Sequence, residues 1–382
     1  MPGWPRVART LPSPTLGLTL ALIPALVPSE VRAQPREAAQ GALAASLRET
    51  CGQPNAALDR VAATLAERKA KGDAPLDLPD LALALRAERI AYVWPRSWAA
   101  RGPSDGAALG RSFSAFRAGV TVGGRAVCGA AELTLPSGER VAAAVVVDAQ
   151  GELAPLKERS RVGEWLTVEA ALEGDFRDAY VMVRGPVGAP RRLPGGFVQS
   201  TGKVRATFAP DTRGAFTVQV VGTTEAGPRP VLEARVFADV APRYVPEPRE
   251  DVSRGLSPAD ALFELVGRLR ANEGLRPLTR DPRLDALALA HARAMVAGRR
   301  LAHDTGAGDP RARAEAAGLR PTVVGENAAT GRETAGLHRA LAESPSHHAN
   351  LRNPAFDRAG FAVVADPSGA LWGCELFAGG LR

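Results

Sequence analysis

The stretch GENAATGRETAGLHRALAESPSHHANL, residues 325–351, places one glutamate after a glycine and two adjacent histidines after a Ser-Pro pair. All five histidines of this 382-residue chain lie between residues 291 and 348. Histidine and glutamate are side chains that commonly transfer protons or bind metal ions. Either Glu326, His347 and an upstream partner form a site, or these polar residues close the ends of helices.

The residues on both sides of this stretch predict helices that end in a β-hairpin. Ser257 is a good N-cap and Gly274 ends the first helix, while a second helix begins at Asp281-Pro282. Elements of this kind pack in layers around a small sheet. The expected elements are helices over 257–274, from Asp281 onward, over 309–318 and over 334–342, and a hairpin over 360–379.

Three fragments in this order resemble the CAP superfamily, which comprises cysteine-rich secretory proteins, antigen 5 and pathogenesis-related 1 proteins. They are GLRPLTRDPRLDALALAHARAMVAGRRLAHD (274–304), GENAATG (325–331) and SPSHHANLRNPAFDRAGFAVV (344–364), followed by a strand with a tryptophan. The resemblance is to the short bacterial branch and covers residues 257–382. It implies an α-β-α sandwich, a secreted or envelope location, and a shallow cleft lined by two histidines and acidic residues.

The family's cleft residues can be carried over one at a time. The histidine after the second helix corresponds to His303, and the glutamate of the Gly-Glu-Asn motif corresponds to Glu326. The histidine of the Ser-Pro-Gly-His motif corresponds to His347, with Ser346 in place of the glycine. A second glutamate of many members would fall one residue from Glu343. The resemblance therefore implies a cleft of His303, Glu326, His347 and Glu343.

Two imidazoles and a carboxylate are a reasonable ligand set for a divalent cation such as Zn²⁺, with His303 and His347 as metal ligands. A metal-bound water could then act as a nucleophile with Glu326 as the candidate base. The chain contains neither an HExxH motif nor a G-x-S-x-G motif. The alternative is structural: Glu326 satisfies loop N–H groups, while His303 and His347 hydrogen-bond each other's surroundings. His291 is expected to be a core-facing, hydrogen-bonded residue.

In the middle of the chain, apolar residues recur at every second position. Alternating apolar residues in LTVEAAL (166–172), AFTVQVV (215–221) and VLEARVFADV (231–240) predict antiparallel strands with one buried face. We expect an immunoglobulin-like β-sandwich over residues 159–241 that acts as a spacer. Prolines and charged residues predict a stiff linker over residues 242–256.

Residues 34–158 predict a small mixed α/β domain. Two segments rich in alanine and leucine, 37–70 and 78–90, have helical spacing. Two hairpins are expected after them, VTVGGRAVC (120–128) and AELTLPSGERVAAAVVVD (131–148). The whole chain is thus expected to be a multidomain α+β protein.

The three cysteines predict one disulfide and one core residue, and two tryptophans lie close together in the sequence. In an oxidising compartment, Cys51 and Cys128 would form a disulfide because both lie in the N-terminal region. Cys374 is expected to be a small core residue. For Trp94 and Trp98 we favour packing in a core or at a sheet edge over a binding face.

The first 33 residues resemble a cleavable signal peptide. Arg6 and Arg9 precede a short apolar segment, residues 16–27, and cleavage after Ala33 is plausible. No later segment is long and apolar enough to span a membrane, so the mature chain is not expected to be an integral membrane protein. The formal charge of +7 is spread along the chain without basic blocks, which argues against nucleic acid as a partner.

These observations favour a secreted or periplasmic, cell-envelope protein that acts as a non-catalytic binding module with a cation cleft. Its partner would be an envelope component, a lipid or another protein. One alternative is a metal-assisted hydrolase of peptides or cell-wall fragments. Another is an adhesin-like structural protein whose sandwich makes the contact.

Overall fold

The computed structural model describes residues 41–381, whose strands form four sheets. The expected signal peptide, residues 1–33, lies outside the described residues. The described residues all fall within one compact unit, so the contacts described below lie within it. In the part of the chain that the structure describes, no helix has the length and apolar character needed to cross a membrane.

The N-terminal region has helices on both faces of a sheet with the strand order β1-β3-β4-β2. Its elements are α1 (Ala42–Cys51), β1 (Gln53–Pro54), α2 (Ala56–Lys71), α3 (Leu78–Ala87), β2 (Arg96–Gly102), α4 (Ala107–Ala118), β3 (Arg125–Thr134) and β4 (Arg140–Ala149). Leu58 of α2 packs with Val145 on one face. Phe113 of α4 packs with Val146 on the other face, because neighbouring strand residues point in opposite directions.

The expected hairpin over VTVGGRAVC is wrong, and helix α4 precedes this segment instead. Only β3 forms there, because the N–H groups of Gly123 and Gly124 donate to the Asp148 carboxylate at 3.1 and 2.8 Å. The second expected hairpin is present as β3 and β4. A disulfide joins Cys51, at the end of α1, to Cys128 in β3.

The next region contains two sheets that share one apolar core. Their strand orders are β10-β11-β7-β5 and β6-β13-β12-β8-β9. The strands are β5 (Gly151–Leu153), β6 (Arg159–Ser160), β7 (Leu166–Leu172), β8 (Asp178–Arg184), β9 (Arg191–Arg192), β10 (Gly195–Val198), β11 (Lys203–Phe208), β12 (Gly214–Thr224) and β13 (Gly227–Ala238).

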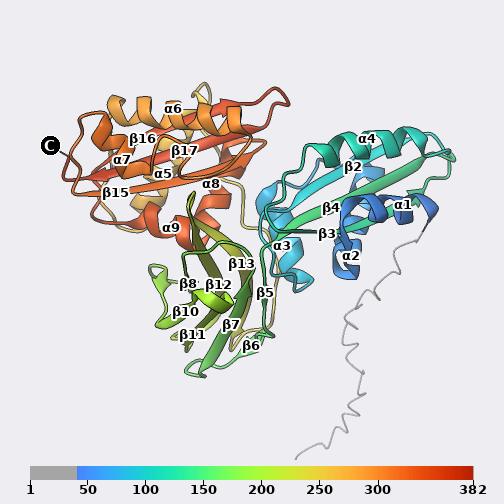
Figure 1. Ribbon diagram of the computed structural model, residues 1–382, viewed down its shortest axis with the longest axis horizontal. Helices are drawn as coiled ribbons and strands as arrows, with labels where there is room; N and C mark the ends of the chain where they lie inside the picture. The colour runs from blue at the N-terminus through green and yellow to red at the C-terminus, as the bar shows by residue number, and fades with distance from the viewer. Residues whose placement is uncertain (1–40, 382) are drawn as a thin grey trace, which may run out of the picture. The chain divides into compact units, whose positions relative to one another are not determined.

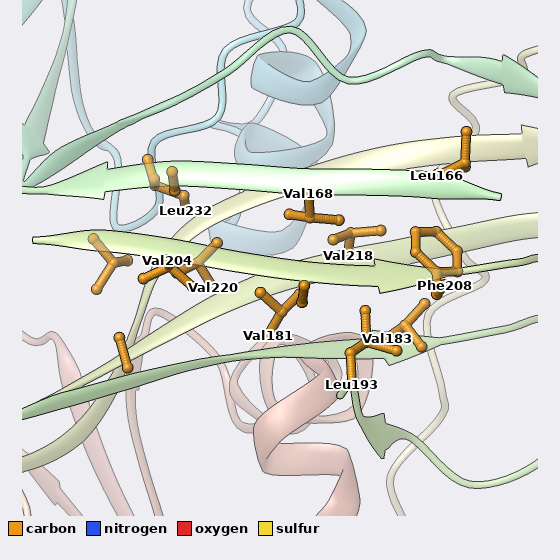
Figure 2. Packing of buried hydrophobic residues seen from close by; sticks show 14 of the residues in the cluster. Leu166, Val168, Val181, Val183, Leu193, Val204, Phe208, Val218, Val220 and Leu232 are labelled. Carbon is orange, nitrogen blue, oxygen red and sulfur yellow. The ribbon is translucent and has the colours of Figure 1, made fainter. Parts of the chain in front are cut away.

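Alternate residues of these strands fill the space between the two sheets. Figure 2 shows Val168 and Val204 of one sheet close to Val181 and Val218 of the other. Strand β5 pairs with β7, so the first sheet begins at Gly151, ahead of the expected start at residue 159. Residues 241–256 contain no helix or strand.

The C-terminal region is built on a sheet with the order β14-β16-β17-β15 (Figure 1). Its elements are α5 (Pro258–Asn272), β14 (Thr279–Arg280), α6 (Pro282–Gly298), α7 (Pro310–Ala316), β15 (Val323–Gly331), α8 (Thr334–Glu343), α9 (Pro345–Arg352), β16 (Arg358–Ala365) and β17 (Leu371–Gly379). The GENAATG segment is strand β15, and the two adjacent histidines lie in helix α9.

Helices cover both faces of this sheet. Phe377 of β17 packs with Leu262 of α5 and Leu337 of α8 on one face. Its neighbour Leu376 packs with Ala288 of α6 on the other face. The period of two in the strand and of 3.6 in the helices produces these three layers.

The disulfide gives the first testable prediction. Because Cys51 and Cys128 are 77 residues apart, their reduction frees a long loop and should lower the free energy of unfolding by about 2–5 kcal/mol. Urea unfolding with and without dithiothreitol measures this difference. The Cys51→Ala/Cys128→Ala variant should not respond to the reductant, whereas Cys374→Ala should respond as the wild type does. Equal unfolding midpoints for the oxidised and reduced wild type would contradict the prediction.

Candidate functional site

Glu326 lies in strand β15, and its side chain is fully buried. His303 follows α6 and reaches it from the loop, and Arg313 reaches it from the short helix α7. Asp309 caps α7 by accepting from the N–H of Ala312, which fixes the helix that carries Arg313. Three separate segments therefore converge on one carboxylate.

Both oxygens of Glu326 accept hydrogen bonds from the protein. His303 Nδ1 donates to Oε1 at 2.8 Å, and Arg313 donates to Oε2 at 2.5 Å. His291 Nε2 lies 3.4 Å from Oε1, and the Cys374 thiol lies 3.4 Å from Oε2. We call these five residues the Glu326 cluster. Burial by itself would raise the pKa of Glu326, but the His303 hydrogen bond and the positive charge of Arg313 outweigh burial and lower it.

His291 and Cys374 contribute neutral groups to the Glu326 cluster. Burial lowers the pKa of His291, whose Nε2 donates to the carbonyl oxygen of Ala302 at 2.9 Å. Burial raises the pKa of the Cys374 thiol well above its usual value, and the nearby Glu326 charge adds to this rise. A thiol that stays protonated is a poor nucleophile. Sequence reasoning placed His291 and Cys374 in the core, and it missed Arg313 because no motif marks it.

His347 does not join the Glu326 cluster. Its Nδ1 is hydrogen-bonded to Ser344 Oγ at 3.0 Å, and in residues 41–381 no hydrogen bond or ion pair links it to Glu326. Gln219 of β12 donates from Nε2 to the same Ser344 oxygen at 3.0 Å. Burial lowers the pKa of His347 to about 3, so the ring is neutral at physiological pH.

Glu343, the fourth expected cleft residue, makes no hydrogen bond or ion pair with the Glu326 cluster in the described residues. It is the last residue of α8, and its carboxylate lies 3.9 Å from Arg339 Nε. Burial raises the pKa of Glu343 to about 7. Glu343 lines a cavity together with Ser344 and His347. The structure thus brings His303 to Glu326 and His347 to the same cavity as Glu343. The His303 charge acts on His347, but no hydrogen bond or ion pair within residues 41–381 joins the two pairs.

The residues present do not fit a bound Zn²⁺. Among the described residues, no group of three or more His, Cys, Asp or Glu side chains is arranged to hold a metal ion. Glu326 already accepts from two donors, one of them the cation Arg313, which would repel a metal ion in this buried position. A base that is fully buried also has no free oxygen with which to reach a substrate.

The turn between β12 and β13 covers the His303 side of the cluster. The backbone N–H groups of His303 and Asp304 both donate to the carbonyl oxygen of Ala226, at 3.0 and 3.1 Å. Gly227 has a positive φ of 104°, and a Cβ at this position would lie 2.8 Å from His303 Cβ. A glycine is required here because a larger residue would force the turn away from the histidine.

A second buried network holds β15 against α9. Asn327 Nδ2 donates to Glu375 Oε2 at 3.0 Å and to the carbonyl oxygen of His347 at 3.2 Å. Asn350 Nδ2 donates to the carbonyl oxygen of Glu326 at 3.0 Å. Burial raises the pKa of Glu375 to about 8. The hydrogen bond from Asn327 lowers this pKa, but its effect is smaller than that of burial. The two asparagines therefore have structural roles.

Replacing Glu326 tests whether the Glu326 cluster is structural. Glu326→Gln leaves the buried Arg313 cation without a counter-ion and should lower the free energy of unfolding by about 3–5 kcal/mol. Urea unfolding measures the loss. Glu315→Gln in α7 is the matched control, because Glu315 forms an exposed ion pair and should cost less than about 1 kcal/mol. Similar losses in both variants would show that the cluster does not stabilise the fold.

His347 should also make the stability depend on pH. Its pKa is about 3 in the folded chain and about 6.5 when unfolded. The contribution of the neutral ring to the free energy of unfolding is therefore complete above pH 6.5 and is lost as the pH falls toward 3. Between pH 6.5 and 4.5 the wild type should therefore lose about 2–3 kcal/mol more than His347→Gln. Urea unfolding of both proteins across this range measures the difference. A difference that does not change with pH would show that His347 titrates normally.

Comparison with known proteins assigns the C-terminal region to a family. Residues 263–376 match the model of the cysteine-rich secretory protein family, CAP. The comparison with curated proteins gives no match.

Several solved structures of bacterial proteins are similar to this chain. An outer surface protein from Borrelia burgdorferi is 23% identical, with 31% of this chain and 90% of that chain covered and a TM-score of 0.30. An extracellular protein containing an SCP domain from Bacillus anthracis is 15% identical, with coverages of 60% and 86% and a TM-score of 0.29. A cysteine-rich secretory protein from Staphylococcus aureus is 12% identical, with coverages of 59% and 85% and a TM-score of 0.28. The family match confirms the resemblance seen in the sequence, over residues 263–376.

Proposed function

We propose that this chain is a secreted or envelope-associated bacterial protein whose CAP domain is a non-catalytic binding module. The observation that carries the proposal is the state of Glu326. Its side chain is fully buried, and both of its oxygens accept hydrogen bonds from protein donors. A carboxylate in this state stabilises a fold, and because it is fully buried it is out of reach of solvent water and of a substrate.

Two features support a location outside the cytoplasm. The first 33 residues have the charge and apolar pattern of a cleavable signal peptide. The Cys51–Cys128 disulfide is of the kind that persists in oxidising compartments. The partner in such a location would be an envelope component, either a lipid or a protein.

In this proposal the two-sheet region serves as an immunoglobulin-like spacer. The shared core of its two sheets and the alternation along its strands support this type. It also offers the observation behind the adhesin-like alternative. Trp165, which precedes β7, has 73% of its surface exposed, and exposed aromatic side chains can anchor a partner.

The test measures binding and turnover in one experiment. Purified protein lacking residues 1–33 is incubated with isolated bacterial cell envelopes, with and without Zn²⁺. We expect the protein to sediment with the envelopes, without release of new amino groups or reducing sugars. Trp165→Ser should bind as the wild type does.

Three results would count against the proposal. Release of product that requires Zn²⁺ and disappears in a folded His303→Gln variant would favour the metal-assisted hydrolase. Loss of sedimentation in Trp165→Ser alone would favour the adhesin-like alternative. No sedimentation of the wild type would remove the binding function.

A further inference from the structure

A cavity of about 80 Å³ lies apart from the Glu326 cluster, where helix α3, the segment before β2, strands β12 and β13, and helix α8 meet. Its wall is largely apolar and includes Leu78, Pro79, Trp94 and Leu341. A water molecule needs about 10–15 Å³ of such volume, so the cavity has room for about five to eight non-hydrogen atoms. This space suits a small ligand.

Trp94 has an unusual backbone conformation at the cavity wall. Its φ is +61°, in the left-handed region, although it is a bulky residue that precedes Pro95. The indole Nε1 donates to the carbonyl oxygen of Pro230 at 3.0 Å, which fixes the ring beside β13. Such a conformation costs about 1–3 kcal/mol and is typical of functional sites. The strained residue therefore forms part of the cavity wall.

Opposite charges without hydrogen-bond partners line the same cavity. Arg235 Nε is buried and, within residues 41–381, has no hydrogen-bond partner. The Glu343 carboxylate lies 3.9 Å from Arg339 Nε, which is too long for a hydrogen bond. Glu233 is already engaged by Arg86 at 3.3 Å. Buried polar groups are normally satisfied, so the unpaired Arg235 Nε indicates a missing partner, and Glu343, whose side chain is 23% exposed, is free to accept from the same partner.

We propose that this cavity binds a free amino acid with a small aliphatic side chain, from alanine to valine in size. The ligand's carboxylate accepts hydrogen bonds from Arg235, and its ammonium group donates to Glu343. Its side chain lies against Trp94 and Leu341. Hydrogen bonds between ionised groups are the strong ones, and the cavity offers one for each end of a zwitterion. This site goes beyond the proposed function and does not depend on it.

The ionisation of Glu343 fits such a ligand. Burial raises the pKa of this carboxyl to about 7, and nearby Glu233 and Glu247 add to the rise, while Arg339 and Arg235 oppose it. An ammonium group beside Glu343 would favour the charged carboxylate and lower its pKa. Binding should therefore release a proton near neutral pH and become tighter between pH 6 and pH 8.

Calorimetric titration of the purified protein with L-valine tests the proposal. We expect one site for L-valine and at least tenfold weaker binding of N-acetyl-L-valine, which lacks the ammonium group, and of L-valinamide, which lacks the carboxylate. Glu343→Gln should weaken L-valine binding at least tenfold. Glu333→Gln, which changes a 72%-exposed glutamate at the start of α8, is the matched control and should bind as the wild type does.

Trp94→Gly provides a second variant that should remain folded, because glycine adopts the left-handed conformation without strain. It should lose L-valine binding while it remains folded, which its far-UV circular dichroism spectrum checks. Absence of binding by the wild type at millimolar L-valine would overturn the proposal. Equal binding of L-valine and its two blocked forms would overturn it too, since the two charges would then play no part. Unchanged affinity in Glu343→Gln would exclude Glu343 as the ammonium partner.

Discussion

The C-terminal domain depends on one buried ion pair, between Glu326 of β15 and Arg313 of α7. His303 in the loop after α6 and Cys374 in β17 also contact the Glu326 carboxylate. A buried carboxylate without partners would cost several kcal/mol, so these segments must be in place together. The pair therefore fixes the arrangement of a helix, a loop and two strands.

The same pair decides what the domain can do. Hydrogen bonds from His303 and Arg313 keep Glu326 ionised and leave it no free oxygen. The Ala226 turn closes the cluster on the His303 side. Residues with the composition of a catalytic site are thereby used to join elements, and this observation underlies the binding function proposed above.

The cavity beside Trp94 differs from the Glu326 carboxylate, because charged groups in its wall lack hydrogen bonds. In it, Arg235 lacks a hydrogen bond at Nε and Glu343 lies at ion-pair distance only. The backbone at Trp94 is strained. Proteins satisfy buried polar groups and relax strain unless another requirement prevails, and ligand binding is such a requirement. The chain thus holds a buried cluster around an ion pair that resembles a site, and a separate cavity that no motif marks.

Local patterns in the sequence determined much of the architecture. The caps at Ser257 and Asp281 and the period of two in residues 166–240 predicted helices and strands that the structure contains, because caps and periodicity act within a few residues. The motif around Glu326 also identified the CAP domain. Tertiary structure alone decided which polar groups meet. Arg313 reaches Glu326, and His347 turns to Ser344 and the cavity, because the packing of helices on the sheet sets these distances and no spacing along the chain encodes them.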